Sequence, residues 1–207
     1  MQLGEARVRS AREDEYPRLA RALAAAFVDD PAWSWLLPFA DRERRQHLFF
    51  ETILRHHVPG RRQVWMSEDG RAAAIWAPPG LWSVPLHRML PEAAPMLRVF
   101  GRRTMLALRY LIRAERLHPR RPPHWYLEVI GAEPARQGRG IGSALMQPIL
   151  ASCDRDGLGA YLESSSERNR ALYERHGFRV VERFDMPGGG PSIRRMWRDP
   201  RPGRALA

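Results

Sequence analysis

Three glycines at alternate positions, Gly138, Gly140 and Gly142, form the segment of the sequence best suited to bind a ligand. They follow an apolar and aromatic run that ends at Gly131, which we expect to form a buried strand. The apolar residues from Ile141 onward are spaced for one buried face of a helix. A glycine-rich turn before a helix exposes backbone N–H groups that have no intrahelical partner, and the helix dipole adds positive charge there. Such a turn binds anions, and it suits phosphate best.

Two common phosphate-binding motifs do not fit this turn. The dinucleotide-binding fingerprint needs glycine at its first, third and sixth positions, and counting from Gly138 the sixth position is Ser143. A P-loop needs a lysine after its last glycine, and the chain contains no lysine. The segment that remains to be explained is QGRGIG, residues 137–142.

This segment resembles the Q/R-x-x-G-x-G/A pattern of the GNAT superfamily, whose members are acyl-CoA-dependent N-acyltransferases. A second segment, GAYLESSSERNRALYERHGF, resembles a further section of that pattern, a fifth strand followed by a helix that carries Asn and Tyr and ends at Gly-Phe. These residues are Asn169, Tyr173, Gly177 and Phe178. Together with HWYLEVIGAEPARQGRGIGSAL, the segment is most similar to the puromycin N-acetyltransferase-like branch, from which the N-terminal half departs.

Apolar periodicity and turn signals predict the element order β-α-α-β-β-α-β-α-β-α-β-β. The expected strands include 7–10, 63–67, 72–77, 179–184 and 192–198, and the expected helices include 13–27, 41–57 and 92–117. This order predicts an α/β fold with a mixed central sheet of about six to seven strands flanked by helices. The resemblance implies the GNAT fold, in which the fourth and fifth strands diverge and acyl-CoA enters the gap between them.

Composition places the chain among soluble globular proteins, since 44% of its 207 residues are hydrophobic and 28% are charged. We expect one domain over residues 1–198 and a disordered tail over 199–207. No signal sequence or membrane-spanning run is recognisable, and the single cysteine, Cys153, excludes an intramolecular disulfide. We therefore expect a cytoplasmic protein without a membrane partner, and a homodimer is compatible with the sequence.

The formal net charge is +11, and the 34 basic residues are all arginines, scattered along the chain. No compact basic tract or nucleic-acid-binding motif accompanies them, so we expect no nucleic-acid partner. The charge suits either a polyanionic ligand such as coenzyme A or a solvated surface. No HExxH motif or cysteine pair is present, so no metal site is expected.

The resemblance implies that acetyl-CoA is the cofactor that donates the acyl group. Its pyrophosphate would lie against the backbone of Gln137, Gly138, Arg139, Gly140, Ile141, Gly142 and Ser143. Its pantetheine arm would pair with the end of the central strand, at Val129, Ile130, Gly131 and Ala132. Asn169 would order the helix after strand five or bind the arm. The side chains of Arg136 and Arg139 either add charge near the phosphates or are simply exposed.

Three residues are candidates for acid–base catalysis. By resemblance, Tyr173 matches the general-acid tyrosine that protonates the departing thiolate, with core packing as the ordinary alternative. The general base is either Glu163, at the end of strand five, or Glu128, on strand four, and we prefer Glu163. A carboxylate in a partly apolar cleft has a raised pKa and can accept a proton through water. A structural role is the alternative for each carboxylate.

The acceptor site would be built from aromatic and acidic residues. Trp125 and Trp33 are candidates for its walls, and Asp29 and Asp30 for holding a cationic amine, while core packing is the ordinary explanation for the tryptophans. The resemblance implies transfer of an acetyl group to a primary amine by direct attack in a ternary complex, and these residues indicate that the acceptor is a small aromatic or hydrophobic molecule. The alternatives are a non-catalytic acyl-CoA-binding sensor and an acetyltransferase of protein N-termini or lysines.

Overall fold

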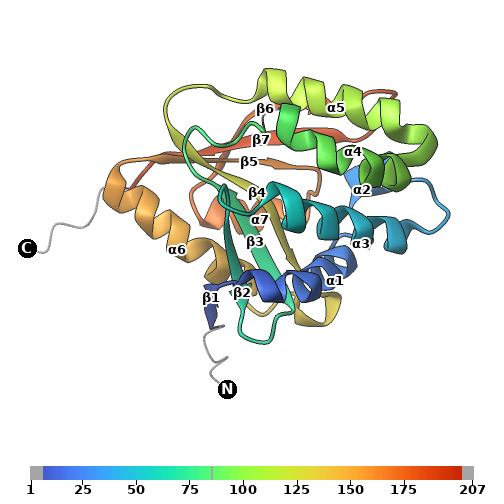
Figure 1. Cartoon of the computed structure of the whole chain (residues 1–207). Helices are drawn as coiled ribbons and strands as arrows, with labels where there is room; N and C mark the ends of the chain where they lie inside the picture. The colour runs from blue at the N-terminus through green and yellow to red at the C-terminus, as the bar shows by residue number, and fades with distance from the viewer. Residues whose placement is uncertain (1–6, 85, 202–207) are drawn as a thin grey trace, which may run out of the picture.

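The computed structural model describes residues 7–84 and 86–201, apart from the side chains of residues 57 and 86–88. Within these ranges a single mixed sheet runs in the order β1-β2-β3-β4-β5-β7-β6 (Figure 1). Its strands are β1 (Val8–Ser10), β2 (Gln63–Ser67), β3 (Ala72–Ala77), β4 (His124–Ala132), β5 (Gly159–Ser164), β6 (Arg179–Asp185) and β7 (Ser192–Arg198). Neighbouring strands are antiparallel except β4 and β5, which are parallel.

Helices cover both faces of the sheet (Figure 1). They are α1 (Tyr16–Ala26), α2 (Pro31–Leu36), α3 (Arg42–Thr52), α4 (Leu86–Phe100), α5 (Thr104–Leu117), α6 (Ile141–Asp156) and α7 (Arg170–Arg175). Consecutive residues of β3 point to opposite faces of the sheet. Trp76 packs in the core under α6, and Ile75 packs in the core under α1 and α3. A third apolar cluster joins α5 to the strand pair β6–β7 around Phe184.

The predicted α/β architecture is confirmed, and the bounds of β2, β3 and β7 agree with the sequence prediction. The single helix expected over 92–117 is wrong, because two helices fill this region and the first begins at residue 86. Gly101 separates them with a φ of 51°, a left-handed conformation that glycine adopts at no steric cost. The apolar patch after Pro31 contains the short helix α2, which periodicity did not predict. Residues 202–207 of the expected tail lie outside the described residues.

The pairing of β4 and β5 ends in the middle of β4. The two strands are in register from His124 with Gly159 to Leu127 with Leu162, and no pairs follow. On its other edge β4 pairs with β3 as far as Ala132. Ile75 pairs with Val129 and Trp76 pairs with Leu127, so Glu128 is an extra residue between these two pairs. An extra residue of this kind is a β-bulge, which bends the strand. The second half of β4 therefore leaves β5, as expected for strands four and five.

Gly131 lets helix α1 approach β4 closely. A Cβ atom at this position would lie 2.8 Å from the Cβ of Ala26 and 3.1 Å from Cε2 of Phe27. These distances are shorter than normal carbon–carbon contacts, so glycine is required here by packing rather than by backbone conformation. The contact holds the connection between α1 and α2 against the unpaired half of β4.

We expect Gly131→Ala to lower the free energy of unfolding by about 1–3 kcal/mol, because the added methyl group overpacks the contact between α1 and β4. Urea unfolding of the purified protein measures this change. A double-mutant cycle with Ala26→Gly provides the control, since deleting the opposing methyl group should remove some of the penalty. Equal penalties in both backgrounds would contradict the proposed contact.

Candidate active site

A cleft opens where β4 and β5 separate. It is lined by β4, the end of β5, the segment before α7, α7 itself and the connection between α1 and α2: Phe27, Asp30, Leu127, Glu128, Val129, Ile130, Leu162, Glu163, Ser164, Ser165, Ser166, Asn169 and Tyr173. The structure thus brings together all three predicted acid–base candidates with Asn169, Asp30 and two residues of the predicted pantetheine strand. These residues come from four regions of the sequence, and the fold makes them neighbours.

The glycine turn follows β4 and leads into α6. Gly138 and Gly140 have φ values of 75° and 78°, and a Cβ at either position would meet no atom within 4 Å. Among the described residues, the amides of residues 138–143 donate to no acceptor, whereas the amide of Ala144 bonds the carbonyl of Gly140. Open space above a row of free amides at a helix N-terminus suits a phosphate group. Gly142 has another role, since a Cβ there would lie 3.0 Å from Leu172 of α7.

Two polar side chains of the turn bind other parts of the protein, and one is exposed to solvent. The Gln137 side-chain amide donates to the carbonyl of Ala132 at 3.0 Å, which folds the turn back onto the end of β4. Arg136 forms an ion pair with Asp69. Arg139 is exposed, and no ion pair of its side chain is found within the described ranges. Arg139 is therefore the cation of this turn that is available to a ligand.

Glu163 is the cleft carboxylate whose pKa lies near neutrality. Burial raises the pKa of its carboxyl to about 7, although the Tyr161 hydroxyl and the charge of Arg195 lower it to some extent. The Tyr161 hydroxyl donates to Oε1 of Glu163 at 2.8 Å. A carboxylate with a pKa near neutrality can accept a proton and release it again under ordinary conditions.

Glu128 is held by an arginine that no sequence pattern singles out. The fully buried Arg62 side chain donates from Nε to Oε2 of Glu128 at 2.6 Å and from Nη2 to Oε1 at 2.9 Å. Arg62 also donates to the carbonyl of Leu81 at 2.6 Å. The bidentate pair fastens the bulge of β4 to the segment after β3. This favours the structural role for Glu128 over the role of base.

Tyr173 and Asp30 face the cleft from α7 and α2. Burial, and then the nearby charge of Asp30, raise the pKa of the Tyr173 phenol, so the phenol keeps its proton at physiological pH. Asp30 caps α2, accepting from the amides of Ala32 and Trp33 at 2.9 and 3.1 Å, and burial raises its pKa. Its other oxygen accepts from Ser165 at 2.7 Å. Asp30 therefore joins α2 to the segment after β5.

Three of the four residues predicted to bind the acceptor do not line the cleft. Trp125 packs in the core under α6, and Asp29 is exposed. Trp33 lies behind Phe27, with ring centroids 6.4 Å apart, and also contacts Phe49 and Phe50. The geometry favours packing roles for the two tryptophans, which is the ordinary alternative for such residues.

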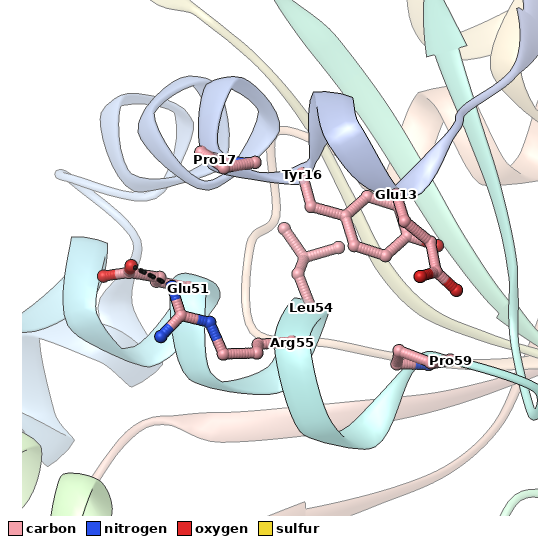
Figure 2. A pocket seen from close by; sticks show the side chains of 7 residues that line it. All are labelled: Glu13, Tyr16, Pro17, Glu51, Leu54, Arg55 and Pro59. Atoms are coloured by element: carbon pink, nitrogen blue, oxygen red, sulfur yellow. Dashed lines mark hydrogen bonds and ion pairs between the residues drawn. The ribbon is translucent and has the colours of Figure 1, made fainter.

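A second hollow lies between α1 and the end of α3 (Figure 2). It is lined by Glu13, Tyr16, Pro17, Glu51, Leu54, Arg55 and Pro59, none of which lines the cleft. Figure 2 shows that Glu51 and Arg55 face one another, and their charged atoms are 3.0 Å apart. The carboxylate of Glu51 is thus engaged by the guanidinium of Arg55.

Among the described residues no group of three or more His, Cys, Asp or Glu side chains could hold a metal ion. In the same ranges no helix is long and apolar enough to span a membrane.

Comparison with known proteins agrees with this geometry. The sequence profile of the Acetyltransferase (GNAT) family matches residues 29–178. An uncharacterised N-acetyltransferase of Schizosaccharomyces pombe is 31% identical over 175 residues, which cover 79% of this chain and 70% of the yeast protein.

Two solved structures extend the comparison. An acetyltransferase of Corynebacterium glutamicum, named for histone acetyltransferase HPA2 and its relatives, superposes with a TM-score of 0.72 at 25% identity, covering 94% of this chain and 96% of its own. Arylalkylamine N-acetyltransferase 2 of Aedes aegypti shares the fold, with a TM-score of 0.56 at 12% identity over 94% of this chain and 98% of its own. The chain therefore belongs to the GNAT family and is an acyl-CoA-dependent acetyltransferase.

Proposed function

We propose that the protein transfers the acetyl group of acetyl-CoA to the primary amine of a small acceptor with an aromatic or hydrophobic body, by direct attack in a ternary complex. The observation that carries this proposal is the pairing of two complementary groups in one cleft. Glu163 has a pKa of about 7, and Tyr173 keeps its proton. One can take a proton from the incoming ammonium, and the other can give a proton to the leaving group.

Acetyl-CoA supplies the activated acetyl thioester. The free amides of residues 138–143, with Arg139 beside them, would hold its pyrophosphate. The half of β4 from Glu128 to Ala132 has no strand partner on its β5 side, so its backbone can pair with the pantetheine arm. Asn169 makes no helix-capping hydrogen bond and lines the cleft, which leaves its amide available to the same arm.

Glu163 would act first. In its ionised form it removes one proton from the acceptor's ammonium group, so that an N–H bond breaks and a carboxyl O–H bond forms. The free amine then attacks the thioester carbon, and the C–S bond breaks. Tyr173 would donate its hydroxyl proton to the departing sulfur, and the second proton that the nitrogen loses on becoming an amide would restore the phenol, directly or through water. The proton held by Glu163 can be returned to solvent when products leave.

The walls of the cleft support a small, partly apolar acceptor. Phe27, Leu127 and Leu162 contribute apolar surface, and Asp30 adds a carboxylate near Tyr173. Similarity to the puromycin N-acetyltransferase-like branch is carried by the motifs of the C-terminal half. An antibiotic amine is therefore one acceptor class to test, while the different N-terminal half argues against puromycin itself.

We expect Gly140→Asp to weaken acetyl-CoA binding at least about tenfold, roughly 1.4 kcal/mol, by placing a carboxylate beside the amides that would hold the pyrophosphate. Isothermal titration measures the change. Gly60→Asp is the matched control, because Gly60 has a φ of 68° and the same open surroundings. Normal affinity in the Gly140 variant would exclude this turn as the pyrophosphate site.

The ionisation of Glu163 makes the rate depend on pH. The carboxyl is mostly protonated below a pKa of about 7 and ionised above it, so kcat/KM should rise with pH through about 7 and then level off. Glu163→Gln should lower kcat/KM about 10²–10⁴-fold and remove this rise, whereas any rise caused by the acceptor amine would remain. An unchanged profile in the variant would eliminate Glu163 as the base.

We expect Tyr173→Phe to lower kcat about 10²-fold or more while acetyl-CoA affinity stays within about twofold, since only a proton donor is removed. Single-turnover assays with thiol detection, together with a binding titration, separate the two effects. Tyr16→Phe, in the second hollow, is the control for loss of a phenol elsewhere. Equal turnover in wild type and the Tyr173 variant would rule out the acid role.

A further inference from the structure

Glu163 is the innermost member of a chain of polar contacts that crosses three strands. Tyr161, two residues earlier on β5 and fully buried, donates its hydroxyl hydrogen to Oε1 of Glu163 at 2.8 Å. Arg195 of β7, which is opposite Glu163 in the strand register, donates from Nε to the Tyr161 hydroxyl at 3.1 Å. Arg195 is in turn ion-paired with Glu182 of β6. The chain leads from a half-exposed carboxylate to the carboxylate of the cleft.

The direction of each hydrogen bond in this chain is fixed by the donor capacity of arginine. A guanidinium group can only donate, so the Tyr161 oxygen must accept from Arg195. The single hydrogen of the phenol is then left for Glu163, and Oε1 is the atom that receives it. Oε2 accepts no hydrogen bond from the described residues and is the oxygen left to receive a proton from the acceptor. Arg195 also lies 5.8 Å from the centre of the Tyr161 ring, which keeps the two side chains together.

We propose that Tyr161 and Arg195 are positioning residues that orient Glu163 and stabilise its ionised form, so that the carboxylate is ready to take the proton of the acceptor. The inference rests on the proposed function, because it assigns these residues through the base that they serve. Neither side chain needs to touch the acceptor. Their effect is on the pH at which Glu163 becomes active.

The other ionisable groups around Glu163 do not provide the same support. Tyr126 of β4 and Tyr110 of α5 stay protonated, because burial and then Glu163 raise the pKa of each phenol. His118 packs edge-on against Tyr161 and is neutral, since burial lowers its pKa to about 3. The two other carboxylates of the cleft are engaged elsewhere, Asp30 in the cap of α2 and Glu128 with Arg62. The Tyr161 hydroxyl and the charge of Arg195 are therefore the influences that favour ionised Glu163.

The sign of the expected effect follows from these contacts. A hydrogen-bond donor and a positive charge both stabilise a carboxylate, so removing either raises the pKa of Glu163. The rise of kcat/KM with pH should then occur at higher pH. We expect Tyr161→Phe and Arg195→Gln each to move its midpoint upward by about 1 pH unit, which is about a tenfold loss of kcat/KM at pH 6. Above pH 9 the rate should return to within about twofold of wild type.

The test is the profile of kcat/KM against pH for wild type, both variants and Arg183→Gln. Arg183 is exposed on β6 next to Glu182, so its substitution removes the same charge outside the chain of contacts. This control should overlay wild type. A midpoint that is unchanged in both Tyr161→Phe and Arg195→Gln, with wild type still rising near pH 7, would overturn the positioning role alone. If Tyr161→Phe does not fold, Arg195→Gln decides the question.

Failure of the proposed base gives a different result. In that case wild type and Glu163→Gln would share one profile, and the midpoint would carry no information about Tyr161. The two outcomes are distinguished within one set of assays. Circular dichroism of each variant establishes that the fold is intact, and titration with acetyl-CoA establishes that acetyl-CoA binding is intact.

Discussion

The structure depends on the point at which two parallel strands stop pairing. After Leu127 and Leu162 the backbone of β4 continues without a neighbour on its β5 side, while β3 still pairs with its other edge. Backbone N–H and C=O groups without partners are costly when they are shielded from water, so an extended ligand that satisfies them is favoured there. The bulge at Glu128 bends the strand, and the bidentate pair with Arg62 holds the bulge in place. The cleft and the residues proposed to bind acetyl-CoA and to catalyse the transfer are all arranged around this separation.

Three carboxylates share the cleft, and their surroundings give them different roles. Glu128 is neutralised by a buried arginine, and Asp30 caps a helix. Glu163 has only a phenol and a more distant arginine to offset its burial, and so its pKa lies near 7. One cleft can thus hold two structural carboxylates and one that changes its charge at neutral pH. The proposal that Glu163 is the base therefore rests on its environment, because the carboxyl groups themselves are chemically equivalent.

Much of the fold and of the candidate site could be predicted from local sequence. Alternating apolar residues and turn signals located β2, β3 and β7, and the glycine series located the start of α6. Sequence patterns also pointed to Glu163, Tyr173, Asn169 and Asp30, and these residues line one cleft. The division of residues 92–117 into two helices was missed because their apolar period continues across Gly101, and only the backbone conformation of that glycine reveals the break.

The partners of the site residues could not be predicted in the same way. Arg62 is 66 positions from Glu128, and Arg195 is 34 positions from Tyr161. No sequence motif distinguishes either residue from the many other arginines of the chain. Strand register brings Arg195 to Tyr161 and Glu163, while Arg62, just before β2, reaches Glu128 across the intervening strand β3. Both the order and the register of strands are properties of the whole sheet. Tyr161 is the exception, since residues two apart on a strand share a face and its proximity to Glu163 follows from that spacing.

The most direct test of the account is a crystal structure of the protein with coenzyme A. We expect the diphosphate oxygens within hydrogen-bonding distance of the amides of residues 138–143. The pantetheine arm should run along residues 128–132, and the sulfur should lie near Tyr173. Coenzyme A bound elsewhere, for example in the hollow between α1 and α3, with no ligand between β4 and β5, would contradict the claim that strand separation creates the active site.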